Sequence, residues 1–256
     1  MPPRFSPDSR LVKAIEPSPN FGERRGVIAP DMLILHYTGM KDSEAALRRL
    51  CEKSSEVSAH YFVFENGRIV QMVPEKKRAW HAGVSSWEGG SDVNSRSIGI
   101  EIANSGHDFG YPDFPKKQIK AVIALCKDII KRRKIRADRV LAHSDVAPAR
   151  KRDPGEKFPW TKLHKNGVGH WVRPARTLRR KSLRVGDRGE EIRAAQEMLA
   201  AYGYEISPTG TFDENTRKIV TAFQRHFRPK RIDGILDPQT RATLHQLLSS
   251  RPHRRD

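Results

Sequence analysis

Two histidines that each close a short apolar run are the first candidates for chemistry. His36 ends the sequence LILH and His143 ends VLAH, and side chains at strand ends can leave the core and meet at a shared site. Asp153 follows in the loop after His143, immediately before a Pro-Gly pair. Two imidazoles and one carboxylate suit Zn²⁺ with its fourth position left to water, the pattern of a catalytic zinc site. The alternative is two ordinary core or surface histidines and an aspartate that caps a turn, and spacing alone leaves both open.

Glu101 and Lys151 could act beside such a metal. Glu101 lies inside the apolar run SIGIEIA, where an unpaired carboxylate is costly, so we expect it to face a polar cavity. Partial desolvation raises the pKa of a glutamate and suits it to take a proton from water. Lys151, two residues before Asp153, could place an ammonium where it stabilises an oxyanion. An exposed edge-strand glutamate and a solvated lysine are the alternatives.

Short runs rich in Ile, Val, Leu and aromatic residues predict the strands that would position these side chains. The Asn-Gly pair at 66–67 is a strong turn signal and predicts a hairpin between two of them. Apolar residues at helical spacing predict helices at 43–53 and 116–134, and Cys126 falls on the apolar face of the second, so we expect it in the core. The predicted strands are 33–37, 60–64, 68–73, 97–103 and 139–143. This pattern is typical of an α/β domain.

The C-terminal part has a different pattern and contains a repeat. GTFDENTR at 210–217 matches GILDPQTR at 234–241. The Asp of each copy sits where it would N-cap a helix, and Pro238 follows one of them at the first helical position. Together with an apolar-periodic segment that precedes them, these copies predict a small all-α domain of three helices. It shows no nucleophile or ligand cluster, so we expect a binding module.

A dense basic run, WVRPARTLRRKSLR at 171–184, separates the two parts. Few of its residues could be buried, which predicts an exposed linker. The whole chain carries 48 Lys and Arg against 30 Asp and Glu, a formal charge of +18. A field of this sign favours anionic partners, but charge alone does not choose between nucleic acid, an acidic glycan and an anionic membrane surface.

Composition excludes several classes of protein. The two cysteines, Cys51 and Cys126, form no CxxC pair, which excludes a disulfide framework, a zinc finger and a redox dithiol. No apolar run approaches the roughly 18 to 20 residues that cross a bilayer, so no transmembrane segment is expected. The N-terminus also lacks the apolar core of a secretory signal.

Taken together, the motifs of residues 30–160 resemble those of the type-2 family of zinc-dependent N-acetylmuramoyl-L-alanine amidases, which includes AmpD-like and AmiD-like enzymes. They occur in the family's order, and the last motif is distinctive by itself. They are LILHYTG at 33–39, SAHYFVFENGRIVQMV at 58–73, AWHAG at 79–83, NSRSIGIEIAN at 94–104 and LAHSDVAPARKRDPGEKFPW at 141–160. The resemblance implies an α/β fold with a mixed central β-sheet flanked by helices.

The resemblance also implies a role for individual residues. His36, His143 and Asp153 would bind one Zn²⁺ per chain. Glu101 would activate water, and Lys151 would polarise the scissile carbonyl and stabilise the tetrahedral intermediate. The positions that line the family's substrate groove fall here on His60, His81, Asn104 and Tyr37.

The C-terminal part resembles the three-helix type of peptidoglycan-binding domain. The matching phrases include LRVGDRGEEIRAAQEML and DGILDPQT. Such a domain would hold the wall polymer near the active site and raise its effective concentration. We therefore predict a zinc amidase domain at 1–172, a basic linker at 173–181, a peptidoglycan-binding domain at 182–250 and a basic tail at 251–256.

The implied function is hydrolysis of the amide between N-acetylmuramic acid, or its 1,6-anhydro form, and the L-alanine of the stem peptide, in cell-wall turnover or recycling. Peptidoglycan and muropeptides would be its partners, and we expect a monomer. The alternative is a non-catalytic peptidoglycan-binding protein with a residual zinc site. Nucleic acid is not expected as a partner, because no recognisable module for it is present. The missing export signal favours the cytoplasm, whereas a wall-binding module fits the periplasm or cell envelope.

Overall fold

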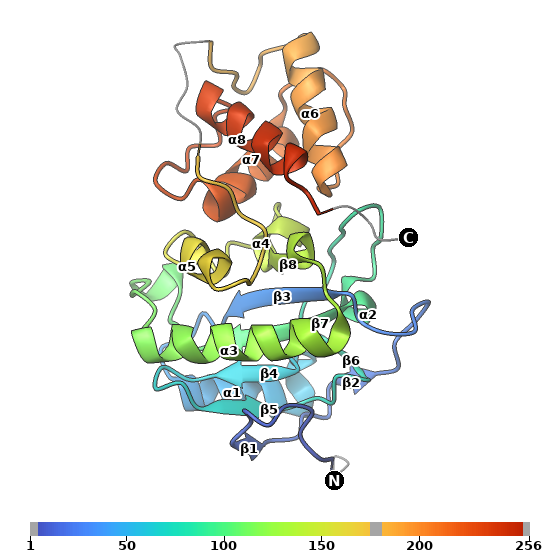
Figure 1. Ribbon diagram of the computed structural model, residues 1–256, viewed down its shortest axis with the longest axis vertical. Coiled ribbons are helices and arrows are strands. Elements are labelled where there is room, and N and C mark those ends of the chain that lie inside the picture. Colours follow the sequence, from blue (N-terminus) through green and yellow to red (C-terminus); the bar gives the residue numbers. More distant parts are fainter. Residues whose placement is uncertain (1–4, 175–180, 253–256) are drawn as a thin grey trace.

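The computed structural model describes residues 5–174 and 181–252 (Figure 1). Its centre is a six-stranded mixed sheet with the strand order β1-β5-β4-β7-β3-β8. Its strands are β1 (Ala14–Ile15), β3 (Met32–Tyr37), β4 (Tyr61–Val63), β5 (Ile69–Gln71), β7 (Ser97–Ile102) and β8 (Val140–Ala142). A separate two-stranded sheet pairs β2 (Phe21–Gly22) with β6 (Arg78–Ala79). Strands β4 and β5 are antiparallel on either side of the Asn-Gly turn, which confirms the predicted hairpin.

Helices cover both faces of the central sheet. The long helix α3 (Lys116–Arg133) lies against one face and α1 (Ser43–Cys51) against the other (Figure 1). Because side chains alternate along a strand, Tyr61 and Val63 of β4 pack into the apolar cluster of α3, whereas Phe62 packs into the cluster of α1. This part also has the short helices α2 (Val93–Arg96), α4 (His143–Val146) and α5 (Trp160–Lys165) and the 3₁₀ turns Lys53–Ser55, His107–Phe109 and Ala137–Arg139.

Three neighbouring parallel strands, β7, β3 and β8, end at one edge of the sheet. Their register pairs His36 with Glu101 and Leu35 with Ala142, so that His143, the residue after β8, lies level with His36. Leu35 packs into the cluster of α3, and the alternation therefore turns His36 and Glu101 toward the opposite face. The sheet thus brings these polar side chains to one place.

The C-terminal part folds into the three predicted helices, α6 (Glu190–Tyr202), α7 (Glu214–Phe227) and α8 (Pro238–Ser249). The carboxylate of Asp213 accepts from the Thr216 N–H at 2.7 Å, and that of Asp237 accepts from the Thr240 N–H at 2.8 Å. These bonds confirm the two N-caps predicted from the repeat, and Pro238 occupies the first turn as expected.

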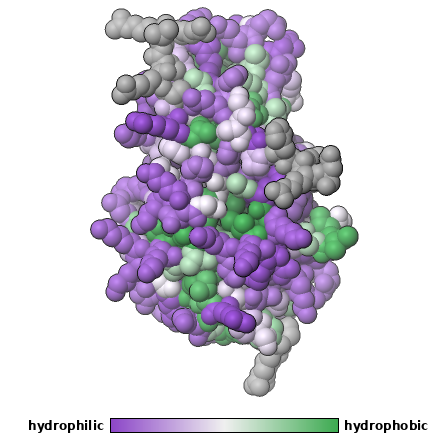
Figure 2. Space-filling view, viewed as in Figure 1, coloured by the Kyte–Doolittle hydropathy of each residue, from purple (hydrophilic) through white to green (hydrophobic). Residues whose placement is uncertain are grey.

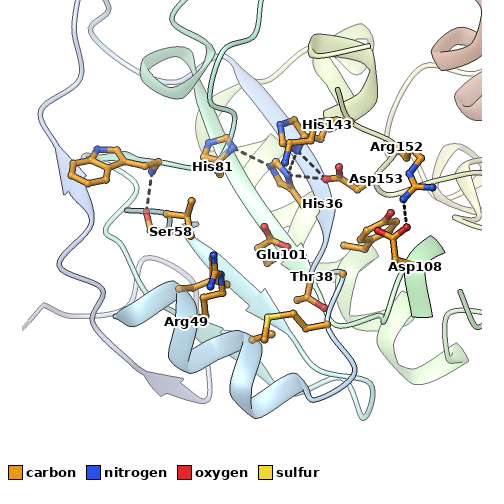
Figure 3. Close-up of a pocket in the computed structure, with 18 of the residues that line it drawn as sticks. His36, Thr38, Arg49, Ser58, His81, Glu101, Asp108, His143, Arg152 and Asp153 are labelled. Atoms are coloured by element: carbon orange, nitrogen blue, oxygen red, sulfur yellow. Dashed lines mark hydrogen bonds and ion pairs between the residues drawn. The ribbon is translucent and has the colours of Figure 1, made fainter. Parts of the chain in front are cut away.

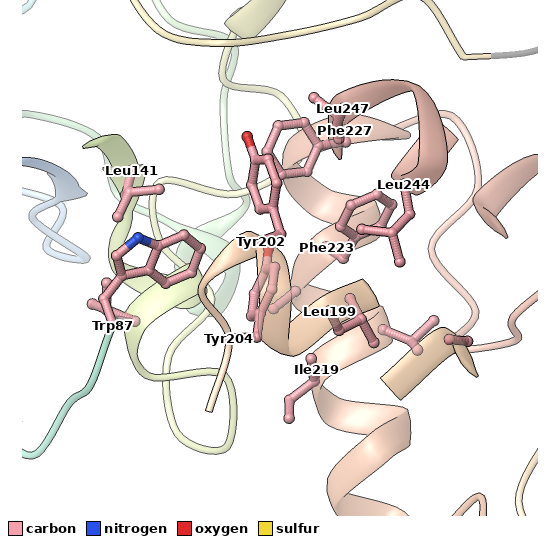
Figure 4. Packing of buried hydrophobic residues seen from close by; sticks show 14 of the residues in the cluster. Trp87, Leu141, Leu199, Tyr202, Tyr204, Ile219, Phe223, Phe227, Leu244 and Leu247 are labelled. Carbon is pink, nitrogen blue, oxygen red and sulfur yellow. The ribbon is translucent and has the colours of Figure 1, made fainter. Parts of the chain in front are cut away.

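The C-terminal helices share one hydrophobic cluster with the sheet-containing part (Figure 4). Trp87 and Leu141 lie in the same buried cluster as Tyr202 and Tyr204, and the ring of Trp87 meets that of Tyr204 edge-on at 5.0 Å. A Cβ at Gly203 would stand 2.4 Å from the Trp87 ring, so only glycine permits this approach. The two parts are therefore packed together like the elements of a single core.

A buried carboxylate adds a polar contact at the same junction. Asp145 of α4 accepts from the Tyr204 hydroxyl at 2.8 Å and lies 2.6 Å from Nδ1 of His226 in α7. The His226 ring also stacks on Trp160, with the ring centroids 3.8 Å apart. Because α4 begins at His143, these contacts join the C-terminal helices directly to the turn that carries a predicted metal ligand.

The surface is mostly hydrophilic on the face shown in Figure 2, and hydrophobic residues occupy only small separate areas there. Within the described residues, none of the helices has the length and apolar character needed to span a membrane. Of the predicted linker and tail, residues 175–180 and 253–256 lie outside the described residues.

We expect the whole chain to unfold in a single calorimetric transition, because its two parts share one core. Trp87→Ala should lower the free energy of unfolding by about 3–5 kcal/mol, since it leaves a large cavity at the junction. Val185→Ala, an exposed position of the C-terminal part, should change it by less than about 0.5 kcal/mol. Two separate transitions in the unmodified protein would contradict a shared core.

Candidate active site

A cavity of about 470 Å³ opens where β3, β7 and β8 end (Figure 3). Its walls come from these strand ends, from α1 and from the loop that follows α4. Five residues predicted to do chemistry line it together: His36, Glu101, His143, Lys151 and Asp153. Residues more than a hundred positions apart in the sequence therefore share one polar cavity.

Three potential ligand atoms converge at the inner end of this cavity. His36 Nδ1 lies 2.9 Å from His143 Nδ1 and 3.1 Å from Asp153 Oδ2. His143 Nδ1 lies 3.0 Å from the same carboxylate oxygen. All three side chains are buried, and among the described residues this is the one cluster of histidine, cysteine and acidic groups with the spacing of a metal site.

The hydrogen bonds of the Nε2 atoms, which point away from the cluster, fix the orientation of the two imidazole rings. His143 Nε2 lies 3.1 Å from the carbonyl oxygen of Ala82 and must donate to it. His36 Nε2 lies 3.0 Å from His81 Nδ1, and His81 Nε2 lies 3.2 Å from the Ser97 hydroxyl. That hydroxyl donates to a backbone carbonyl 2.5 Å away, so it accepts from His81. The network thus assigns Nε2–H to His36 as well, and leaves both Nδ1 lone pairs facing Asp153.

This donor set fits a divalent cation. Burial lowers the pKa of His36 to about 4 and also holds the pKa of His81 well below its ordinary value, so both rings are neutral near pH 7. Two imidazole nitrogens and one carboxylate oxygen supply three donor atoms and one negative charge at a single point. Without a cation or a proton between them these atoms would repel one another.

Glu101 lies beside this cluster, and its carboxyl group is buried. Burial raises its pKa well above the ordinary value, the charge of Asp153 adds to the rise, and Lys151 opposes it. Its Oε2 atom is buried and has no hydrogen-bond partner among the described residues. A desolvated carboxyl of raised pKa is suited to accept a proton and to release it again.

The residues predicted to contact substrate occupy different positions. Tyr37 lines the cavity and its hydroxyl lies 2.9 Å from His107 Nδ1. His81 also borders the cavity, but both of its ring nitrogens are engaged as described above. His60 and Asn104 are buried outside the cavity lining, where His60 Nδ1 accepts from the Gly99 N–H at 3.0 Å. Asn104 Nδ2 donates to a backbone carbonyl at 2.9 Å. Substrate contact by these four residues stays a prediction.

Two features of the site were not predicted from the sequence. The hydrogen bond between His36 and His81 depends on Gly99, because a Cβ at position 99 would stand 2.5 Å from the His81 ring. A glycine among the apolar residues of β7 is the sequence signal that could have indicated this close approach. Arg150 holds the loop beside His81, since it donates to the carbonyl oxygens of Val84, at 2.8 Å, and of Ala82. The basic run around Lys151 is the sequence signal that could have drawn attention to Arg150.

Comparisons with known proteins agree with this fold. The model of the N-acetylmuramoyl-L-alanine amidase family matches residues 26–156, and that of a putative peptidoglycan binding domain matches residues 188–244. The N-acetylmuramoyl-L-alanine amidase AmiD of Escherichia coli K12 is 40% identical over 229 residues, which cover 85% of this chain and 82% of AmiD. The 1,6-anhydro-N-acetylmuramyl-L-alanine amidase AmpD of Citrobacter freundii is 34% identical over 164 residues, 57% of this chain and 86% of AmpD.

Solved structures extend the likeness over both parts of the chain. The structure of E. coli AmiD in complex with anhydro-N-acetylmuramic acid-L-Ala-D-γ-Glu-L-Lys superposes with a TM-score of 0.74 at 36% identity, and covers 91% of this chain and 98% of AmiD. AmpDh3 of Pseudomonas aeruginosa gives a TM-score of 0.72 at 30% identity, and covers 98% of this chain and 100% of AmpDh3. Fold and site define an amide hydrolase. The chain belongs to the N-acetylmuramoyl-L-alanine amidase family.

The hydrogen bond from His36 to His81 gives a direct prediction for metal binding. His81→Phe keeps a ring but removes the acceptor that orients His36, so the affinity for Zn²⁺ should fall roughly 10- to 100-fold. A competition titration against a chromophoric chelator measures this affinity. His164→Phe is the control, because His164 bonds only to a backbone carbonyl away from the cavity and should bind Zn²⁺ like the unmodified protein. Equal affinity in both variants would contradict the role of His81.

Proposed function

We propose that this protein is a zinc-dependent amidase that cleaves the bond between N-acetylmuramic acid, or its 1,6-anhydro form, and the L-alanine of the stem peptide. The observation that carries the proposal is the buried Glu101, whose Oε2 has no hydrogen-bond partner among the described residues, in one cavity with His36, His143 and Asp153. The relatives AmiD and AmpD support the proposal, because their names describe amidases that act on this bond.

Zn²⁺ is the proposed metal because of the donors and their number. Imidazole nitrogen and carboxylate oxygen are ligands that zinc accepts readily, and a closed structural site would take four protein ligands. His36, His143 and Asp153 are three. A Zn²⁺ held by them would supply a Lewis acid for the scissile carbonyl and lower the pKa of the attacking water.

Glu101 is the proposed general base. Glu101 lines the cavity in which the scissile carbonyl would lie, so its carboxyl group can take the proton of the water that attacks the carbonyl carbon. The raised pKa of Glu101 lets the same carboxyl hold that proton and then release it to the nitrogen of L-alanine. The C–N bond breaks as the nitrogen is protonated, and the products are a muramic acid carboxylate and a peptide with a free amino terminus.

We propose that the ammonium group of Lys151 stabilises the negative charge that forms on the carbonyl oxygen. Lys151 lines the same cavity as Glu101 and Asp153 and forms no ion pair with another described side chain. A cationic group placed where charge develops stabilises the transition state more than the ground state. The C-terminal helices, in this proposal, hold the wall polymer so that its stem peptides reach the cavity.

Glu101→Gln gives the sharpest test of the mechanism. The amide keeps the shape of the side chain but cannot accept a proton, so kcat should fall roughly 10²- to 10⁴-fold, whereas the zinc content per chain should stay that of the unmodified protein. Chromatographic assay of peptide released from an anhydromuramyl tripeptide measures the first, and elemental analysis the second. His36→Ala, by contrast, should lose both metal and activity. Near-normal turnover by Glu101→Gln would show that another group is the base.

A further inference from the structure

A second groove, of about 300 Å³, lies between the loop 148–152 and helix α7 of the C-terminal part. We call it the junction groove. No acidic residue lines it, and its charged lining residues are all cations: Arg150, Lys151, Arg152, Arg217, Lys218 and Arg225. Cations from both parts of the chain therefore face one shared space.

The junction groove adjoins the catalytic cavity. Arg150, Lys151 and Arg152 line both spaces, so the loop that carries the proposed oxyanion partner forms a common wall. A ligand that reacts at the predicted metal ligands and follows this loop would reach Arg217 and Lys218 of α7.

The protein neutralises only part of the positive charge of the groove, where Arg152 pairs with the exposed Asp108. Lys151 and Lys218 form no ion pair with another described residue, and Nε of Arg225 is buried without a hydrogen bond. The carboxylate nearest to that nitrogen, Glu156, is 3.9 Å away, too far for a hydrogen bond. Arg217 pairs only with Glu214, one turn before it on the exposed surface of α7, and such pairs contribute little. The groove thus offers cations to an external anion.

In a muropeptide, the anionic groups that such a groove could bind lie on one side of the scissile bond. On the sugar side the polymer is uncharged near the bond, whereas on the peptide side free carboxylates recur. In the peptide L-Ala-D-γ-Glu-L-Lys, bound in the AmiD structure, the γ-linkage leaves one carboxylate free and the chain end supplies another. An extended stem of this kind adds about 3.3–3.6 Å of length per residue, so its carboxylates lie several ångströms beyond the scissile bond.

We propose that the junction groove binds the free carboxylates of the stem peptide, on the leaving side of the scissile bond. Arg217 and Lys218 then belong to the substrate site, and the C-terminal part contributes directly to specificity. The packing of Trp87 and the contacts of Asp145 hold α7 against the catalytic part, so the groove is formed before substrate arrives. This inference rests on the proposed amidase function.

The test compares two substrates and two variants of the full-length protein loaded with zinc. The substrates are anhydromuramyl-L-Ala-D-γ-Glu-L-Lys and the same compound with its peptide carboxylates converted to carboxamides. The groove variant is Arg217→Gln/Lys218→Gln. The control is Lys181→Gln/Arg193→Gln, which removes two charges from the same part; Arg193 pairs with Glu190 on α6 as Arg217 pairs with Glu214 on α7.

We expect the groove variant to raise KM for the carboxylate substrate about 5- to 10-fold with little change in kcat, since two exposed charge contacts are lost. The preference of the unmodified protein for that substrate over the carboxamide should shrink by the same factor. The control should keep the preference. Added salt should raise KM for the carboxylate substrate in the unmodified protein and have less effect in the groove variant.

Equal KM values for the groove variant and the control would overturn the groove assignment, as would an equal loss on both substrates. Unmodified protein that cleaves neither substrate would instead refute the proposed amidase function. Melting temperatures of both variants within the error of the unmodified protein establish that any change in KM is not a loss of folding.

Discussion

The approach of His36, His143 and Asp153 at 2.9–3.1 Å is the constraint on which the rest of the site depends. The lone pairs of two imidazole nitrogens and a carboxylate oxygen do not attract one another, so other contacts must hold these groups together. The parallel register of β7, β3 and β8 brings the backbones level. His81 and the Ala82 carbonyl then fix the outer nitrogens. A cation at the shared point would replace this repulsion with attraction to all three groups.

The C-terminal helices take part in that arrangement. Helix α4 carries His143 at its start and Asp145 two residues later, and Asp145 is held by Tyr204 and His226 of the C-terminal part. The same packing places α7 next to the loop of Lys151. The C-terminal helices, which we expected to form a separate binding domain, therefore share their core with the catalytic part. They also line the junction groove. The proposed polymer-binding part and the candidate active site therefore meet at one junction.

Much of this could be predicted because the signals are local. Strands β3 and β8, which bring His36 and His143 to the site, are short apolar runs, and the helix caps at Asp213 and Asp237 need only a few neighbouring residues. The role of His81 was missed because it depends on Gly99 in a strand far along the chain. Trp87 and the junction groove were missed for a related reason: their contacts join parts of the chain that no periodicity relates, and the basic loop alone looks like a solvated surface.

Digestion of purified anhydro and reducing-end muropeptides with and without a zinc chelator, followed by mass spectrometry, would establish whether this protein is a zinc amidase. We expect release of stem peptides with a free amino-terminal alanine, loss of that release in chelator, and its return when Zn²⁺ is added back. The ratio of the two substrates cleaved distinguishes recycling from turnover of the wall. Cleavage that persists in protein shown to be free of metal, or no cleavage by protein that holds zinc, would contradict this expectation.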